Sequence, residues 1–238
     1  MRRSYVAPLM LAVLSLGTLT TLPRRAAASA ITWGTPQTIA ADTDISTAGV
    51  LLGAFDFNTG ATVNTVPFKA YSLGTPNFTL SPVDTGVNED SATPPFGSLS
   101  PAYHSILRAS DGNDAGPLVL TMTGLTPGSN YEFEWWLNAT NANSGVFNST
   151  ATAGNSVTLV SNTTRQDGGV GQFAIGTLTA DLSGQQSITF TGTGSWQITA
   201  FELRQLPVSV PEPNGLSVFL LGLACLFGAA LRNKLRNA

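Results

Sequence analysis

The chain has 238 residues, of which 42% are hydrophobic and 11% are charged, and its formal net charge is −3. Residues 31–210 hold four basic and thirteen acidic residues, a net charge of −9, whereas the other seven basic residues lie near the two ends. An acidic centre would repel nucleic acid, whose binding depends on Lys and Arg, and the single cysteine, Cys225, excludes an internal disulfide.

The N-terminal segment has the three parts of a secretion signal. A basic start is followed by the mostly apolar residues 6–22 and by small residues at 26–30, which fit the cleavage pattern of signal peptidase. We therefore predict that residues 1–30 form a helical signal peptide and that signal peptidase cuts before Ile31. Because two arginines follow the apolar run, an uncleaved N-terminal anchor is the alternative.

Residues 31–206 contain many short runs typical of β-strands, separated by Gly, Pro, Asn and Asp. Regularly spaced short strands with polar turns indicate one all-β domain, a β-sandwich or jelly roll. The predicted strands are 31–39, 50–58, 63–73, 77–81, 117–123, 130–138, 156–161, 171–180, 186–191 and 196–205.

Two aspartates that follow the first strand, Asp42 and Asp44, occupy alternate positions, as the acidic ligands of calcium loops do. We predict them as candidate ligands of a structural calcium ion and expect no other cofactor. A second acidic stretch, residues 111–114, is a further calcium candidate, although turn formation explains it equally well.

One segment departs from the strand pattern. Ser100 suits a helix cap, Pro101 suits the first helical position, and apolar residues follow at helical spacing. We predict a single short helix over about 100–108. The sole histidine, His104, falls within this helix, so we expect it to pack against the protein or to lie on the helix surface, and not to act in catalysis.

The turn over residues 124–131, Gly-Leu-Thr-Pro-Gly-Ser-Asn-Tyr, resembles the corner that is common in fibronectin-like and jelly-roll domains. The resemblance implies a structural role for Tyr131. Its hydroxyl is expected to hydrogen-bond back to the backbone of the turn, as in a tyrosine corner.

The strand predicted over 130–138 alternates between two faces. Its odd-numbered aromatic residues are expected in the core: Tyr131, Phe133 and Trp135. The other face carries two carboxylates, an indole and an amide: Glu132, Glu134, Trp136 and Asn138. An indole stacks on sugar rings and polar groups bind their hydroxyls, so we predict a ligand face here. The alternative is that a loop or the short helix covers Trp136.

Glu132 and Glu134 also raise the question of catalysis. Residues two apart on a strand would place their carboxylates about 6–7 Å apart, within the range of a glycosidase pair. Such pairs normally come from different strands around a cleft, and no such partner is assigned here. We therefore predict a non-catalytic protein. The alternatives are a secreted glycan-active enzyme and a purely structural protein without a ligand.

The last three predicted strands end in Ala-Phe-Glu-Leu-Arg at 200–204. Their layout resembles the galactose-binding-like and carbohydrate-binding jelly rolls of secreted bacterial proteins. This resemblance implies a β-sandwich that associates with polysaccharide.

The C-terminal segment combines a proline-rich linker over 207–215, an apolar run over 216–231 and a basic tail over 232–238. Sixteen residues span about 24 Å as a helix, close to the ~30 Å hydrocarbon core of a bilayer. We predict a transmembrane helix whose tail stays in the cytoplasm, because cytoplasmic flanks are rich in basic residues. The basic residues of the tail are Arg232, Lys234 and Arg236.

This order of parts resembles the PEP-CTERM sorting signal of bacteria, with Pro211, Glu212 and Pro213 as the triplet. The resemblance implies that the membrane enzyme exosortase recognises the triplet and that the protein is processed near it. It also implies a host that makes extracellular polysaccharide. We expect an exported protein, anchored in the membrane or released at the cell surface; an ordinary anchor with an accidental triplet is the alternative.

Overall fold

The computed structural model describes residues 29–83, 85–87, 91–112, 116–141, 147–193 and 198–207. The predicted signal peptide, except its last two residues, lies outside them. So do the linker after Pro207, the transmembrane segment over 216–231 and the tail over 232–238. Within the described ranges, every helix is too short or too polar to cross a bilayer.

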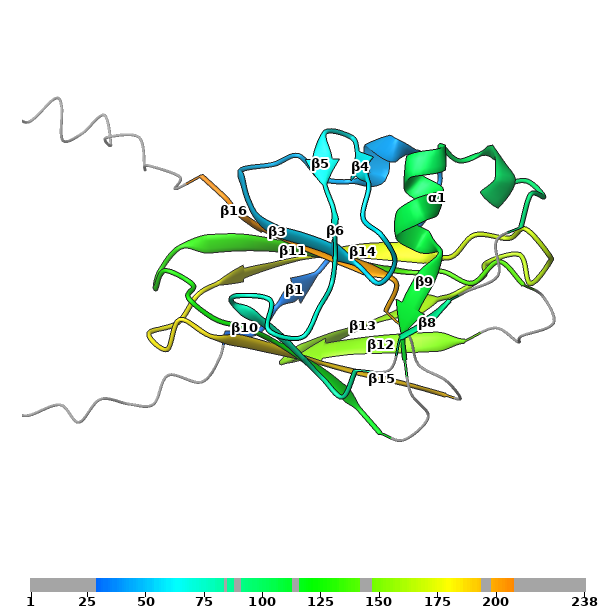
Figure 1. Cartoon of the computed structure of the whole chain (residues 1–238). Coiled ribbons are helices and arrows are strands. Elements are labelled where there is room, and N and C mark those ends of the chain that lie inside the picture. Colours follow the sequence, from blue (N-terminus) through cyan, green and yellow to red (C-terminus); the bar gives the residue numbers. More distant parts are fainter. Residues whose placement is uncertain are drawn as a thin grey trace, which may run out of the picture.

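Two sheets, antiparallel except for one strand pair, form a β-sandwich (Figure 1). The larger sheet has the order β1-β14-β11-β16-β3-β6, with β2 also paired to β14 and with β3 and β6 running parallel. Its strands are β1 (Thr32–Trp33), β2 (Gln37–Thr38), β3 (Val50–Asp56), β6 (Lys69–Ala70), β11 (Asn130–Leu137), β14 (Gln172–Thr179) and β16 (Ala200–Gln205).

The smaller sheet has the order β13-β12-β15-β10-β7. Its strands are β7 (Phe78–Ser81), β10 (Leu118–Met122), β12 (Asn148–Ala153), β13 (Asn155–Val160) and β15 (Gln186–Thr193). Two short ribbons complete the strands: β4 (Thr62–Val63) with β5 (Val66–Pro67), and β8 (Thr85–Val87) with β9 (Ala109–Asp111).

The main core lies between the two sheets and confirms the predicted inward face of residues 130–138. Tyr131, Phe133 and Trp135 are all buried in this core. Trp135 meets Phe190 of the smaller sheet edge-on, with ring centroids 5.0 Å apart. Aromatic pairs in this geometry stabilise a core beyond the area that they bury.

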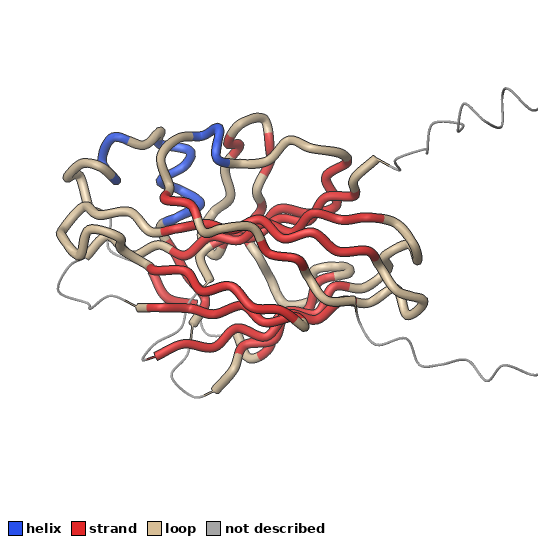
Figure 2. Tube along the Cα trace, turned by 180° about the vertical axis from the view of Figure 1, so that it is seen from behind, coloured by secondary structure: helices blue, strands red, loops and turns tan. Residues whose placement is uncertain are grey.

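A second apolar cluster covers one half of the outer face of the larger sheet, so the molecule has a third, partial layer (Figures 1 and 2). This layer is built by α1 (Pro101–Leu107), the 3-10 turns η1 (Asp42–Asp44) and η2 (Phe96–Ser98), and the ribbon of β4 and β5. Its buried side chains include Ile45, Phe68, Phe96, Tyr103, Ile106, Trp136 and Phe173.

Helix α1 confirms the predicted short helix. The Ser100 hydroxyl accepts a hydrogen bond from the Tyr103 backbone N–H at 3.1 Å, and Pro101 is the first helical residue. The tyrosine corner is also confirmed, because the Thr126 backbone N–H donates to the Tyr131 hydroxyl at 2.7 Å. Gly128 in this turn has a φ of +78°, a conformation that favours glycine.

Several stretches differ from the predicted strands. The run over 31–39 yields only β1 and β2, and the short strands β8 and β9 were not predicted. The run over 63–73 is broken by a turn at Asn64 and Thr65, which both have positive φ, and yields only the short strands β4, β5 and β6. Strand β12 was not predicted, because its sequence, Asn-Ser-Thr-Ala-Thr-Ala, lacks large apolar residues. Its inward positions are filled by small side chains that fit against the neighbouring strands: Ser149, Ala151 and Ala153.

Both ends of the described chain lie at the end of the sandwich remote from α1 (Figures 1 and 2). Ser29 at the start and Leu206 near the finish line the same groove there. The connections to the two terminal segments therefore leave the domain on one side.

Candidate functional site

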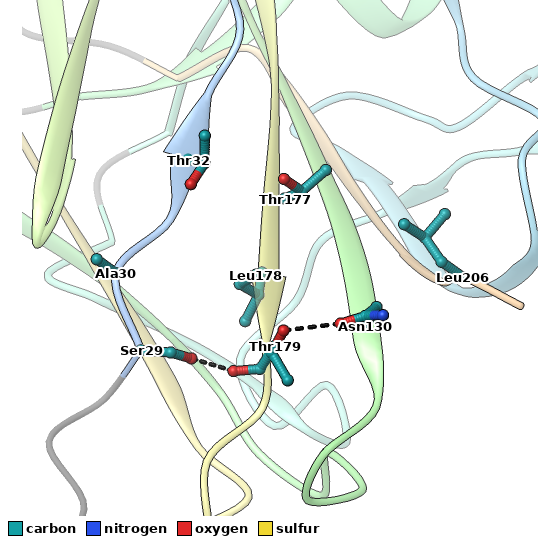
Figure 3. A pocket seen from close by; sticks show the side chains of 8 residues that line it. All are labelled: Ser29, Ala30, Thr32, Asn130, Thr177, Leu178, Thr179 and Leu206. Atoms are coloured by element: carbon teal, nitrogen blue, oxygen red, sulfur yellow. Dashed lines mark hydrogen bonds between the residues drawn. The ribbon is translucent and has the colours of Figure 1, made fainter. Parts of the chain in front are cut away.

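The outer face of the larger sheet changes from apolar to polar along its strands. Cross-strand register sets Trp136 opposite Phe173 and Ala200, under the α1 layer. The next row brings Glu134 opposite Glu202, and the row after that runs through Thr32, Thr177, Glu132 and Arg204. Beyond the α1 layer the polar rows open into a groove (Figure 3).

Trp136 does not form the predicted sugar platform, because its side chain is 0% exposed. Its ring packs edge-on against Phe68, with centroids 5.7 Å apart, and stacks near Phe173 at 6.3 Å. Its indole N–H donates to the Tyr103 hydroxyl at 3.0 Å. The short helix and the neighbouring loops thus cover the ring, which was the alternative interpretation.

Asn138 is likewise buried, and its hydrogen bonds hold neighbouring segments of the protein together. Its side-chain oxygen accepts from the Gly171 backbone N–H at 2.9 Å, and its own backbone N–H donates to the Thr199 hydroxyl, also at 2.9 Å. These bonds join the end of β11 to the segments beside it. The amide therefore has no exposed surface to offer to a ligand.

Glu134 and Glu202 form a buried carboxyl pair that sequence reasoning missed. They face each other on adjacent strands, with 0% and 1% exposure. Glu134 Oε2 accepts from the Ser46 backbone N–H at 3.0 Å, and Glu202 Oε1 accepts from Arg204 Nε at 3.0 Å. The two glutamates lie 68 residues apart in sequence, so only strand register brings them together.

Burial governs the protonation of this pair. It raises the pKa of Glu134 well above its usual value, and the charge of Glu202 raises it further. Burial also raises the pKa of Glu202, to about 7, although the neighbouring Arg204 opposes the rise. Burial and the neighbouring carboxyl thus favour a protonated form in this pair, at Glu134 more than at Glu202.

Glu132 and Glu134, the pair considered for catalysis and rejected from the sequence, do not face each other across a cleft. The two residues do share one face of β11, as alternation requires, and Glu132 is partly exposed beside Thr177. Glu134, however, is covered completely. A substrate bound at Glu132 would have no access to the Glu134 carboxyl in this structure.

The open groove has a volume of about 430 Å³ (Figure 3). It is lined by Ser29, Ala30, Thr32, Asn130, Thr177, Leu178, Thr179 and Leu206. The Thr179 hydroxyl donates to the Asn130 side-chain oxygen at 2.7 Å, and the Ser29 hydroxyl donates to the Thr179 carbonyl. The residues that line the groove contribute four hydroxyls, one amide and three apolar side chains. The hydroxyls and the amide can exchange hydrogen bonds with a polyhydroxylated ligand.

Asp42 and Asp44 have protein donors as partners. Asp44 Oδ2 accepts from the backbone N–H groups of Ala40 and Ala41 at 2.6 and 3.0 Å, and Asp42 Oδ1 accepts from the Ser100 hydroxyl at 2.7 Å. These bonds organise η1 and attach it to α1. Among the described residues, no group of three or more His, Cys, Asp or Glu side chains is placed to hold a metal ion.

The remaining candidate residues from the sequence lie in different places. Asp111 is buried in β9, while residues 113 and 114 of the same stretch lie outside the described ranges. His104 stacks on Phe96 with centroids 4.4 Å apart, in keeping with the packing role expected for it. The sorting triplet over 211–213 lies outside the described residues.

Comparison with known proteins adds little to this description. No protein-family model and no curated protein matches the chain. One solved structure that resembles it belongs to a study of the promiscuous specificity of carbohydrate-binding modules from the β-sandwich superfamily. It is 12% identical, with a TM-score of 0.24, over 78% of this chain and 100% of that one. A similarity this low carries no argument, so the β-sandwich assignment depends on strand order and core alone.

Proposed function

We propose that this chain is an exported, non-catalytic bacterial envelope protein whose β-sandwich lies outside the membrane and associates with polysaccharide. Signal peptidase would process the N-terminal segment, and exosortase would recognise Pro211, Glu212 and Pro213. The support for export is the pair of terminal segments with their basic flanks, together with an acidic, cysteine-free domain between them.

The open groove supports the association with polysaccharide. In the domain that begins at Ile31, the hydroxyl and amide groups of the groove belong to Thr32, Asn130, Thr177 and Thr179, which β1, β11 and β14 of one sheet hold in place. Ser29 precedes the expected cleavage site, so the proposal does not depend on it. A groove on rigid strands keeps such groups in place, so little ordering is needed when a ligand binds.

The same geometry favours binding over turnover. A glycosidase needs two accessible carboxyls on either side of the scissile bond, one of them protonated. Glu134 and Glu202 are carboxyls on adjacent strands, but both are buried. The partly exposed Glu132 beside the groove has no accessible acidic partner in this row of the sheet.

Binding to a glycan array tests the proposal. The full chain is purified in detergent and compared with Thr177→Val, which removes one groove hydroxyl at nearly constant volume. The loss of one hydrogen bond of about 1 kcal/mol should weaken binding about fivefold. The matched control is Thr191→Val, an exposed threonine on the outer face of the smaller sheet, which should leave binding unchanged.

Two results would contradict the proposal. The full chain could bind no polysaccharide, or the two valine variants could weaken binding equally, which would place the ligand elsewhere. Release of sugar fragments by the native chain would instead favour the alternative of a glycan-active enzyme.

A further inference from the structure

A short surface loop, residues 46–49, crosses the outer face of the larger sheet beside the groove; we call it the latch loop. It is anchored at one end by the buried Ile45. At the other end Gly49, with a φ of +63°, lies so close to the β16 backbone that a Cβ would come within 3.1 Å of the Leu206 Cα. Leu206 also lines the groove, so Gly49 of the latch loop lies against a residue of the groove wall.

Two polar bonds tie the middle of the latch loop to the sheet. The Ser46 backbone N–H donates to Glu134 Oε2 at 3.0 Å, and Arg204 Nη1 donates to the Ala48 carbonyl at 3.3 Å. The side chains of Thr47 and Ala48 are exposed and add no apolar packing. The closed position of the loop therefore depends on the charged groups beneath it.

These groups can be counted element by element. β11 supplies Glu132 and Glu134, β16 supplies Glu202 and Arg204, and α1 and η1 supply the neighbouring Tyr103 and Asp44. β3 and β14 contribute the uncharged Leu51, Ala54 and Ile175. Four carboxyls, those of Glu132, Glu134, Glu202 and the more distant Asp44, thus lie around the one guanidinium of Arg204.

Because the carboxyls outnumber the single guanidinium, the buried Glu134–Glu202 pair is expected to retain a proton. With one proton on the Glu134–Glu202 pair, the pair carries a single negative charge, and Arg204 balances it. Without that proton, two carboxylates would face each other on adjacent strands, away from water, and like charges in such a site repel strongly. Glu134 Oε1 and Glu202 Oε2 receive no N–H or hydroxyl donor that would offset this repulsion.

We infer that the latch loop is a pH-sensitive cover: it stays closed while Glu134 and Glu202 share a proton, and it opens when the pair becomes fully ionised. Opening lets water reach both carboxylates, which relieves their repulsion. Because Gly49 of the latch loop lies against Leu206 of the groove wall, opening also removes this contact beside the groove. The latch extends the proposed function but does not depend on it, since no ligand takes part.

The direction of the pH effect follows from the raised pKa values. The folded pair binds more protons than the unfolded chain above pH 4.5, the usual value for glutamate. Its contribution to stability is fully present below about pH 4.5 and is lost as the pH rises through about 7. Opening of the latch loop relieves the same repulsion between the two carboxylates locally, without unfolding the sandwich.

Hydrogen exchange of the Ser46 amide reports on the latch directly. The full chain in detergent is followed by mass spectrometry from pH 5 to pH 8, with correction for intrinsic exchange rates, in peptides that cover residues 45–50. Protection should fall by up to about tenfold per pH unit once the pair begins to ionise, because one proton is released on opening. Peptides from β15 should keep their protection.

Glu134→Gln should remove the pH dependence. Its amide N–H₂ donates to Glu202 at every pH, and its amide oxygen still accepts from Ser46. The matched control is Glu132→Gln on the same strand, in which the dependence persists at slightly lower pH, because a neighbouring negative charge is lost. Should circular dichroism show Glu134→Gln unfolded, Glu202→Gln replaces the shared proton in the same way.

The latch proposal is contradicted if the hydrogen-exchange protection of residues 45–50 is constant from pH 5 to pH 8 in the native chain. It is also wrong if the pH dependence survives in a folded Glu134→Gln or Glu202→Gln variant. Glycan binding plays no part in these readouts, so failure of the latch and failure of the proposed function are distinguishable.

Discussion

Trp135 and Trp136 are neighbours in sequence but belong to different cores. Trp135 points between the sheets and meets Phe190, whereas Trp136 points outward and is covered by Phe68 and Tyr103. Alternation along β11 correctly assigns them to opposite faces. It does not reveal that both faces are buried, because that depends on what packs against the outer one.

At Trp136 we expect substitution to reduce stability and not ligand binding. Trp136→Ala should lower the free energy of unfolding by about 3–5 kcal/mol, because a fully buried ring is replaced by a cavity. Trp136→Phe should cost less, since it keeps much of the packing and loses the bond to Tyr103. Urea unfolding measures both, and glycan binding of the folded variants should match the native chain.

A partly exposed indole provides the comparison for this experiment. Trp33→Ala should cost less than Trp136→Ala, because Trp33 only packs against the edge of the main core. A stable Trp136→Ala variant that had lost glycan binding would contradict the buried position and favour the sugar platform.

Helix α1 depends on the rest of the protein for its stability. It has seven residues, too few for a helix to be stable alone in water. Its stability comes from the buried residues Tyr103, Ile106 and Leu107 and from the Ser100 cap. The cap also connects two elements, because the Ser100 hydroxyl accepts from α1 while it donates to Asp42 of η1.

Ser100→Ala should therefore lower the free energy of unfolding by about 1–2 kcal/mol, the range for loss of a helix cap. Ser105→Ala, in the same helix, is the matched control and should change it by less than about 0.5 kcal/mol, because the Ser105 hydroxyl has only a distant contact, 3.4 Å from Thr59. Urea unfolding compares the two. Equal losses would show that the cap does not hold the third layer in place.

The whole molecule presents one acidic domain whose two ends leave on the same side. The predicted linker between Pro207 and the apolar segment is eight residues long, which reaches about 28 Å at most when fully extended. If the predicted anchor is present, this tether would keep the domain near the membrane surface.

Deletion of residues 208–238 should release the domain from the membrane into the surrounding medium, because the predicted anchor and its basic tail are removed. Fractionation followed by immunoblotting measures this. Replacement of Pro211, Glu212 and Pro213 by alanine is the control, and it should leave the protein in the membrane with an unprocessed C-terminus by mass spectrometry. Retention of the truncated chain in membranes would contradict the C-terminal anchor and favour an uncleaved N-terminal one.

Local sequence determined much of this fold. The cap and proline at Ser100 and Pro101, the corner at Tyr131 and the inward face of β11 each depend on residues within a few positions of one another. Period, capping and turn chemistry act over such distances, so they could be predicted. Strand β12 escaped prediction because its small side chains are selected by neighbouring strands and not by any local pattern.

Only the tertiary structure decided the site. The pairing of Glu134 with Glu202, the cover over Trp136 and the groove shared by Ser29 and Leu206 all join residues that are distant in sequence. Strand register and the packing of a third layer determine these contacts, and both depend on the free energy of the whole assembly. The chemistry of each side chain was visible in the sequence, whereas its exposure, and hence its use, was not.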